Sequence, residues 1–312
     1  MLRSDEGRCI IFTFLATMLL LFTILHPLVD ALSASILWIG ASGIVSFIAY
    51  NFCAFALQFP LGMVLDAWPH ALKGAFAVGM LLLLGGGVLC LCGFVSLPVI
   101  CACCVGNAFF HLSAGKLVLD YTEGRSGPVA CFISTGALGL LAGKLFATSY
   151  PTILISTLGI ALLAGSAVAL RTVPFAVAPM CRCHRLSTMN WCLLIGLFVL
   201  IAGRSRIILY DGALGDSVAF LLTGTLVSLI GQAAGGYLSD RVGRLLVVAV
   251  SIVGCVLLYL GIGLETPVAR CSVLFLAQMA TGPVLSLVRA CMRQASGTAF
   301  GFNCLGLFAG TF

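Results

Sequence analysis

The chain has 312 residues, of which 61% are hydrophobic and 8% charged, and its mean hydropathy is +1.19. A soluble globular protein carries about 25% charged residues because its surface must be hydrated, so this composition excludes a soluble enzyme, a nucleic-acid-binding protein and a disordered chain. The net charge of +6 comes from short polar clusters between long apolar stretches. These stretches lack the polar–apolar alternation of a transmembrane β-barrel, so they predict an all-α polytopic membrane protein.

Eleven membrane-spanning helices are predicted in chain order. Between Arg8 and Asp66 lie 57 residues with a single charged residue, Asp30. Because about 20 residues cross a bilayer, this stretch must cross twice, and its midpoint near Leu37 suits a turn. Asp30 then lies inside the first helix. The predicted spans are 9–36, 43–65, 74–95, 98–119, 128–149, 152–171, 189–211, 217–238, 245–264, 270–289 and 295–312.

The distribution of Lys and Arg predicts the orientation. Twelve of these residues fall in one set of loops and four on the other side, which is a strong positive-inside bias. We therefore expect the N-terminus in the cytoplasm. We also expect a monomeric, multi-pass protein of a bacterial inner (cell) membrane. The twelve are Arg3, Arg8, Lys73, Lys116, Arg125, Arg171, Arg182, Arg185, Arg241, Arg244, Arg289 and Arg293, and the four are Lys144, Arg204, Arg206 and Arg270.

No motif in the sequence indicates an enzyme or a bound cofactor. Ser/His/Asp, HExxH and Walker A patterns are absent, so we predict neither catalytic residues nor ATP-driven pumping. The chain has fifteen cysteines. The loop that contains Cys181, Cys183 and His184 offers three ligands, where a structural zinc site uses four. We therefore expect no cofactor and no metal site.

Two short patterns recur along the chain and indicate two related halves. Gln, Gly and Asp recur from 58–66 to 232–240 at an offset of 174 residues, and Ser-Gly recurs from 126–127 to 296–297 at an offset of 170. Parallel repeats of this kind build one large class of secondary transporters. The sequence therefore predicts a six-helix half over 1–173, a cytoplasmic linker over 174–188 and a second half of five helices over 189–312.

The stretch 236–244, GYLSDRVGR, resembles the loop motif G-x-L-[SA]-D-R-x-G-R of the major facilitator superfamily. The resemblance implies a two-half helical bundle that works by alternating access. It also implies a conformational-switch role for Gly236, Asp240, Arg241, Gly243 and Arg244. The twelfth helix of this superfamily is missing, which we interpret as a truncated product or an eleven-span variant.

The first-half copy of this motif departs from the family pattern. It keeps Gly62 and Asp66, but Ala67, Pro69 and His70 stand where the family has Arg, Gly and Arg. We assign Gly62 and Asp66 to the same switch. Because the arginines are absent, we expect this copy to hold the two halves together more weakly than the second copy.

Two further segments resemble fosmidomycin-resistance-type efflux transporters within the superfamily. His26-Pro-Leu-Val-Asp30 in the first span and Gly106-Asn107-Ala-Phe-Phe110-His111 in the fourth match the His-x-x-x-Asp and Phe-His features of those proteins. Leu112 stands where they have Pro. The resemblance implies efflux of a small compound.

The ionisable residues inside the first and fourth spans are candidates for proton coupling. A charged side chain at the bilayer centre costs about 2.5–3.5 kcal/mol, and those that persist are commonly functional. His26 and Asp30 are four residues apart and share a helix face. A His beside a carboxylate suits a proton relay, and we add His111 and Asn107 to this set. The alternative is that Asp30 lies near the outer rim and His26 is its structural partner.

Arg204 and Arg206 in the seventh span are candidate substrate-binding residues. A planar guanidinium binds two oxygens of a carboxylate or phosphate, so these residues favour an anionic substrate. The alternative is a snorkelling pair that meets Asp211 or Asp216. Four further charged residues are expected to form a solvated cytoplasmic loop: Lys116, Asp120, Glu123 and Arg125.

Together these features predict a secondary transporter, with a small organic or anionic substrate, protons and the lipid bilayer as its partners and no nucleic acid. We expect His26, Asp30, His111 and Arg204 to meet in one central cavity. The alternative is a truncated, non-transporting remnant or membrane scaffold, in which these residues scatter.

Overall fold

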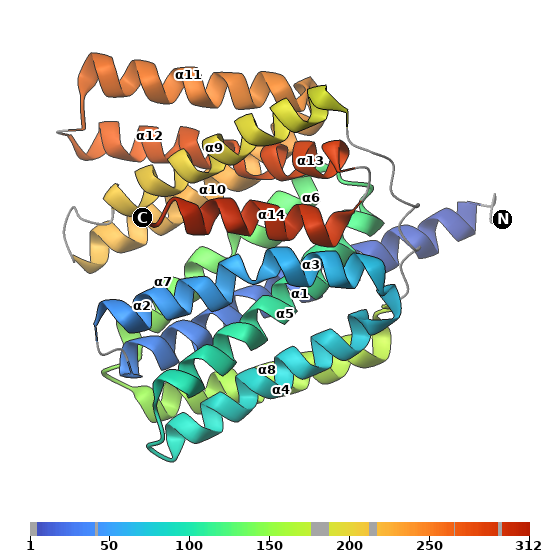
Figure 1. Ribbon diagram of the computed structural model, residues 1–312, viewed down its shortest axis with the longest axis vertical. Helices are drawn as coiled ribbons and strands as arrows, with labels where there is room; N and C mark the ends of the chain where they lie inside the picture. Colours follow the sequence, from blue (N-terminus) through green and yellow to red (C-terminus); the bar gives the residue numbers. More distant parts are fainter. Residues whose placement is uncertain (1–4, 41–42, 176–186, 212–216, 265, 293–294) are drawn as a thin grey trace.

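The computed structural model describes residues 5–40, 43–175, 187–211, 217–264, 266–292 and 295–312. Within these ranges the chain forms helices joined by short turns and contains no β-strand (Figure 1). The α-helices are α1 (Asp5–Gly40), α2 (Ile44–Asn51), α3 (Gln58–Ala67), α4 (Leu72–Leu91), α5 (Leu97–Tyr121), α6 (Ser126–Ser134), α7 (Gly136–Phe146), α8 (Pro151–Thr172), α9 (Thr188–Asp211), α10 (Val218–Val242), α11 (Arg244–Ile262), α12 (Pro267–Met279), α13 (Thr281–Cys291) and α14 (Ser296–Ala309). The predicted all-α class is confirmed.

Ten segments of the described chain are long and apolar enough to cross a membrane, from Thr13–Gly40 to Pro267–Cys291. They correspond to the first ten predicted spans, so the chain is an integral multi-pass membrane protein. The turn expected between the first two spans lies between Gly40, where α1 ends, and Ile44, where α2 begins. The eleventh predicted span contains α14, whose 14 residues extend about 21 Å at 1.5 Å per residue.

Three of the spans are interrupted helices. A π-helical turn, Phe52–Ala56, joins α2 to α3, Thr135 separates α6 from α7, and Ala280 separates α12 from α13. Inside a membrane, side chains of neighbouring helices or local 3₁₀ and π turns satisfy the backbone groups that such interruptions free. At the second break the hydroxyl of Thr135 donates a hydrogen bond to the carbonyl of Thr23 on α1, at 2.9 Å. This bond joins the fifth span to α1 at the break.

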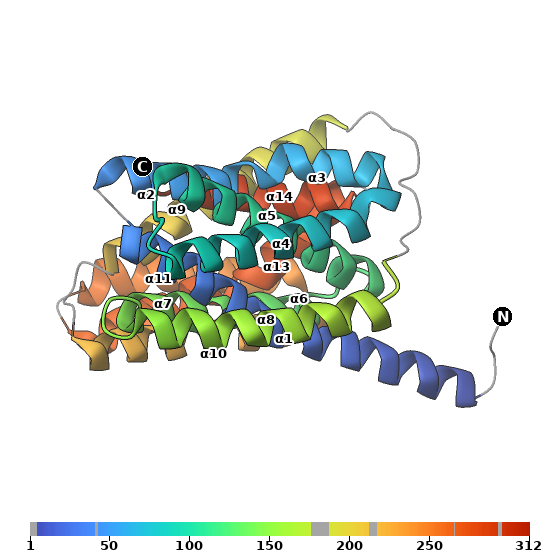
Figure 2. The same ribbon diagram turned by 90° about the horizontal axis from the view of Figure 1, so that it is seen from below.

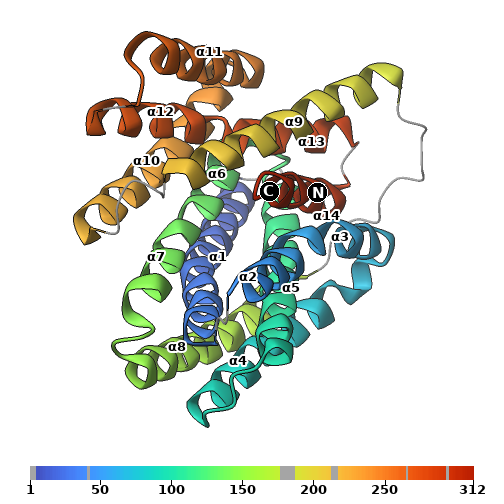
Figure 3. The ribbon, with the colours of Figure 1, turned by 60° about the vertical axis from the view of Figure 1, so that its left-hand side comes forward.

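The helices form two packed groups (Figure 3). In the first, α1 packs against α5, α7 and α8, and α4 packs against α5 and α8. In the second, α10 packs against α11 and α12, and α14 packs against α9. The most extensive contacts between the groups are those of α3 with α14 and of α6 with α10, and α5 also contacts α14. The domain boundaries at 173 and 189 remain a prediction, since linker residues 176–186 lie outside the described residues.

The ends of the bundle can be told apart by α1. Its N-terminal part projects beyond the other helices (Figure 2), at the end where α3 finishes and α14 begins (Figure 1). The turns after α3, α5, α10 and α13 all lie at this end, because each follows an even number of crossings. We call it the N-terminal end of the bundle.

Candidate functional site

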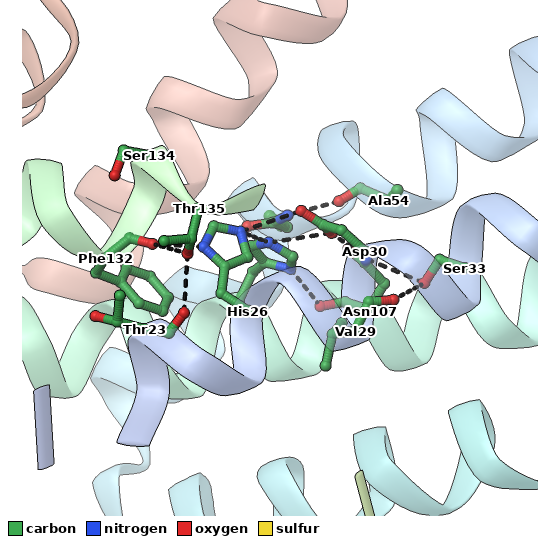
Figure 4. A network of polar contacts seen from close by, with 12 residues as sticks. Thr23, His26, Val29, Asp30, Ser33, Ala54, Asn107, Phe132, Ser134 and Thr135 are labelled. Atoms are coloured by element: carbon green, nitrogen blue, oxygen red, sulfur yellow. Dashed lines mark hydrogen bonds and ion pairs between the residues drawn. The ribbon is translucent and has the colours of Figure 1, made fainter. Parts of the chain in front are cut away.

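Four polar side chains from two helices meet inside the first group of helices. Figure 4 shows His26, Asp30 and Asn107 close together. His26 and Asp30 lie one turn apart on α1, and Asn107 and His111 lie one turn apart on α5. All four are buried, with exposed fractions between 3% and 8%. We call His26, Asp30, Asn107 and His111 the His–Asp cluster. The structure brings these four residues together, and their predicted role in proton coupling remains a proposal.

Asp30 is at the centre of the cluster. Its Oδ2 lies 3.2 Å from Nε2 of His26, and its Oδ1 lies 3.6 Å from Nε2 of His111. The amide nitrogen of Asn107 donates to Oδ1 at 2.9 Å and also contacts the hydroxyl of Ser33 at 3.1 Å. The two Nε2 atoms of His26 and His111 are 2.7 Å apart. The carboxylate is thus held between two imidazoles and an amide.

The hydrogen bonds of the two Nδ1 atoms determine whether the facing Nε2 atoms of His26 and His111 carry protons. Nδ1 of His26 lies 2.6 Å from the carbonyl oxygen of Phe132, and Nδ1 of His111 lies 2.9 Å from that of Asn107. A carbonyl only accepts hydrogen bonds, so each Nδ1 must carry a proton and donate it. In a neutral imidazole each Nε2 is then a bare lone pair. Two such lone pairs at 2.7 Å repel each other, so the arrangement fits a proton that the two Nε2 atoms share.

The packing around the cluster explains why it keeps this geometry. The ring of Phe132 on α6 stacks on His26, with centroids 4.8 Å apart. Gly136 at the start of α7 lets that helix approach α1, since a Cβ there would lie 2.5 Å from Oδ2 of Asp30. Gly139 and Gly143 continue the same close contact one and two turns later. The glycine ridge of the fifth span therefore brings α7 against α1 beside the cluster.

Arg204 and Arg206 do not behave as a pair. Arg204 on α9 is 6% exposed, and its guanidinium donates a hydrogen bond to the hydroxyl of Thr281 at the start of α13. Thr281 in turn bonds Gln278. Arg206, two residues later, is exposed. Among the described residues, Arg204 has neither an ion pair with a carboxylate nor a polar contact with the His–Asp cluster, so the expected single meeting point holds for His26, Asp30 and His111 only.

The second-half motif meets the start of α6. Asp240, close to the end of α10, accepts hydrogen bonds from the backbone N–H groups of Ser126 and Gly127, both at 2.8 Å. These are orphan donors of a helix N-terminus, where a negative charge is stabilised. Gly236 lies at the helix crossing, because a Cβ there would lie 2.7 Å from the Ser126 carbonyl oxygen. We call this set the Asp240 contact.

Gly243 and Arg244 of the motif lie beside the Asp240 contact. Gly243 has φ of 105°, a conformation that favours glycine, and it ends α10. Arg244 donates to the carbonyl oxygen of Gly124 at 3.1 Å, whereas Arg241 is exposed. A cavity of about 630 Å³, lined in part by Arg125, Gly243 and Arg244, opens beside the contact.

The first-half motif makes the corresponding contact with α14. Asp66, near the end of α3, accepts from the backbone N–H groups of Gly297 at 3.0 Å and Thr298 at 2.7 Å. It also accepts from the Thr298 hydroxyl at 2.7 Å. Gly62 and Gly297 allow the approach, since a Cβ on Gly297 would lie 2.9 Å from the Gly62 carbonyl oxygen. We call this set the Asp66 contact. Each repeat motif therefore packs on the Ser-Gly repeat of the opposite half.

Lys116 gives the Asp66 contact more polar partners than the Asp240 contact, which is the reverse of the expectation. Its ammonium group lies 2.7 Å from Asp66 and 3.1 Å from Asp120, and Lys116 and Asp66 are 4% and 2% exposed. Asp120 also faces Arg289 and accepts from Ser296, from the second half. The expectation of a solvated loop is thus wrong for Lys116. The first-half motif, expected to bind more weakly, has more polar partners than Asp240, because a lysine from α5 replaces the missing loop arginines.

Several of these partners were not predicted as functional. No sequence motif includes Thr281, Thr298 or Lys116. Only the Ser-Gly repeat indicated the helix N-termini that Asp66 and Asp240 bind. A repeat found in sequence does not tell which half it contacts. The crossed pairing of α3 with α14 and α6 with α10 is a property of the folded bundle.

Comparisons with known proteins agree with the architecture. No protein-family model and no curated protein matches the sequence. Among solved structures, the chain is similar to FucP, a major facilitator superfamily transporter in the outward conformation, with a TM-score of 0.68 and 13% identity over 96% of this chain and 89% of that one. A variant of the Escherichia coli fucose:proton symporter FucP gives a TM-score of 0.66 at 12% identity, over 96% of this chain and 89% of that one.

A third similar structure is a bacterial homologue of the iron transporter ferroportin in the outward-facing state. Its TM-score is 0.60 at 14% identity, over 95% of this chain and 90% of that one. At these identities the likeness concerns the fold, and it does not single out the fosmidomycin-resistance subgroup. The chain therefore has the two-group helical fold of major facilitator superfamily transporters.

Proposed function

We propose that this chain is a secondary transporter that moves a small molecule by alternating access, with residues 1–173 and 189–312 as the moving halves and 174–188 as their linker. The observation that carries the proposal is the pair of crossed aspartate contacts at one end of the bundle. Both are polar and join a side chain of one half to a helix start of the other. Contacts of this kind can break and reform without exposing a large apolar core.

In this proposal the N-terminal end of the bundle faces the cytoplasm, which the positive-inside bias supports. The two aspartate contacts then close the cytoplasmic side, as in a state that faces outward. Separation of the contacts would open that side. Asp66, Asp240 and their glycines serve in this proposal as the switch, together with Arg241, Gly243 and Arg244.

Proton coupling is assigned to the His–Asp cluster. The 2.7 Å separation of the two Nε2 atoms calls for a shared cation, and a proton is the simplest one. The similarity to a fucose:proton symporter supports coupling to protons, whereas the resemblance of the His26 and His111 segments favours antiport and efflux. The proton would leave when separation of the halves lets water reach His26 and His111, which are both buried in this structure.

The substrate is proposed to be a small organic anion. Arg204 is a buried guanidinium that uses one of its five donors on a neutral hydroxyl. Among the residues whose side chains the structure describes, which do not include Asp211 and Asp216, no carboxylate pairs with it. A buried cation without a counter-ion is expensive, and a carboxylate or phosphonate of the substrate would supply that charge. Arg206 is left out of this role because it is exposed. The protein acts as a monomer in a bacterial inner membrane in this proposal.

The experiment is a transport assay with the purified full chain in proteoliposomes that contain an internal pH dye. Pulses of carboxylates and phosphonates should produce a substrate-dependent pH change, which Asp30→Asn abolishes. Arg206→Gln is the control that should keep it. If folded protein gives no pH change with any compound of the panel, the result would contradict the proposal and favour the non-transporting remnant.

A further inference from the structure

The His–Asp cluster has the features of a metal site as well as those of a proton site. Nε2 of His26, Nε2 of His111 and a carboxylate oxygen of Asp30 all lie within 4.8 Å of one another. Two imidazoles and one carboxylate form a common ligand set for divalent transition metals. We propose that this cluster binds a divalent transition-metal ion, of which Zn²⁺ and Co²⁺ are the representative cases. The inference deepens the proposed function by naming a second ion for the cluster.

The spacing of the ligands is the first argument. In a tetrahedral site with bonds of about 2.0–2.1 Å, neighbouring ligand atoms are about 3.3 Å apart. Here Nε2 of His26 lies 3.2 Å from Oδ2 of Asp30, Nε2 of His111 lies 3.6 Å from Oδ1 of Asp30, and the two Nε2 atoms are 2.7 Å apart. One ligand atom from each residue lies within 4.8 Å of the other two, so the three side chains are near coordination size. To hold an ion, the two imidazoles must move apart by about half an ångström and the carboxylate must turn one oxygen toward both.

The orientation of the ligands is the second argument. A metal-bound histidine generally donates its other ring N–H to a carbonyl or carboxylate, which points the free lone pair at the ion. Both histidines do so here, through Phe132 and Asn107. Asn107 also fixes the Asp30 carboxylate. A proton shared by two imidazoles needs no third ligand on the same side, whereas an ion uses all three.

The surroundings suit an ion that is exchanged and not permanently held. Three protein ligands leave a fourth position open, as in sites that admit water or substrate. Phe132 and Phe110 line the cluster and keep its dielectric low. Conduction or exchange requires binding that is strong enough to select an ion and weak enough to release it.

The test is a Co²⁺ titration of the purified full chain in detergent at neutral pH, followed by visible absorption. We use Cys181→Ser with Cys183→Ser as background, so that the loop thiols do not compete. One ion per chain with a nitrogen–oxygen spectrum is expected. Asp30→Asn and His111→Gln should each weaken the affinity about tenfold or more, and Zn²⁺ should displace the Co²⁺ signal.

The matched control is His70→Gln, which removes an exposed histidine far from the cluster in sequence. It should leave the affinity unchanged. Because His111→Gln could unfold, size-exclusion and thermal stability are measured for each variant, and the nearly isosteric Asp30→Asn provides the second test. Absence of Co²⁺ binding by folded protein, affinity unchanged in both cluster variants, or a sulfur-to-metal spectrum would each overturn the inference.

Failure here is distinguishable from failure of the proposed function. Binding is measured without transport, so a chain that moves protons but binds no Co²⁺ holds a proton site only. A chain that binds Co²⁺ at the cluster but never transports keeps the metal site and contradicts the transporter.

Discussion

Replacement of Asp240 by Asn should loosen the start of α6 by a predictable amount. The two Asp240 oxygens accept from the N–H groups of Ser126 and Gly127. The amide of Asn keeps one acceptor and turns a donor toward the other N–H group. One charge-assisted hydrogen bond contributes about 1.5–3 kcal/mol, and the charge at the helix N-terminus about 0.3–1 kcal/mol more.

Asp240 is an exposed residue overall, so solvent screening reduces both contributions. We take about 2 kcal/mol as the loss, which corresponds to about a 30-fold shift of an open–closed equilibrium at 1.4 kcal/mol per tenfold change. Backbone hydrogen exchange measures this equilibrium directly. Exchange of the Ser126 and Gly127 amides should become about 30-fold faster in Asp240→Asn.

The assay is hydrogen–deuterium exchange with mass spectrometry on protein in lipid nanodiscs, read on peptides that contain residues 126–127. Glu123→Gln is the matched control, because it removes an exposed acidic charge near the same helix start without a hydrogen bond to α6. If Glu123→Gln accelerates exchange as much as Asp240→Asn, the effect is general electrostatics. Unchanged exchange in Asp240→Asn would refute the reasoning.

The remaining predictions concern the other contacts. Asp66→Asn should accelerate exchange at Gly297 and Thr298 more than Asp240→Asn does at α6, since it also leaves buried Lys116 with one partner fewer; an equal or smaller effect would contradict the burial argument. Gly62→Val should open the same contact because its side chain would overlap the Gly297 carbonyl, whereas Gly159→Val on α8, with no atom near its Cβ position, should leave thermal stability and exchange unchanged. Arg204→Gln should reduce uptake of anionic substrates at least tenfold in a counterflow assay, and equal activity of Arg204→Gln and Arg206→Gln would remove the anion role.

Much of the fold was predictable because lipid imposes it. Inside a bilayer, a long apolar stretch satisfies its backbone hydrogen bonds by forming a helix, so ten spans could be placed from composition and length. The turn after Gly40 followed from the same arithmetic, since 57 residues with a single charge are too many for one crossing.

The candidate site was predictable only in part. The four-residue spacing placed His26 beside Asp30, but His111 and Asn107 entered through a family resemblance and not through any periodicity. Lys116 was misassigned because a lysine near a helix end reads as solvated. Its burial depends on Asp66, fifty residues earlier, and on Asp120, and such a pairing has no local signal in the sequence.

The two functional regions of the molecule are joined by shared helices. His111 and Lys116 both lie on α5, so the helix that carries one imidazole of the cluster also carries the cation of the Asp66 contact. α6 provides the Phe132 carbonyl that His26 binds, and its first residues are those that Asp240 binds. Any ion that pushes His26 and His111 apart therefore acts on the helices of both contacts. Coupling through rigid, contiguous elements of this kind is physically direct, and it would be refuted if His26→Gln left exchange at residues 126–127 and 297–298 unchanged.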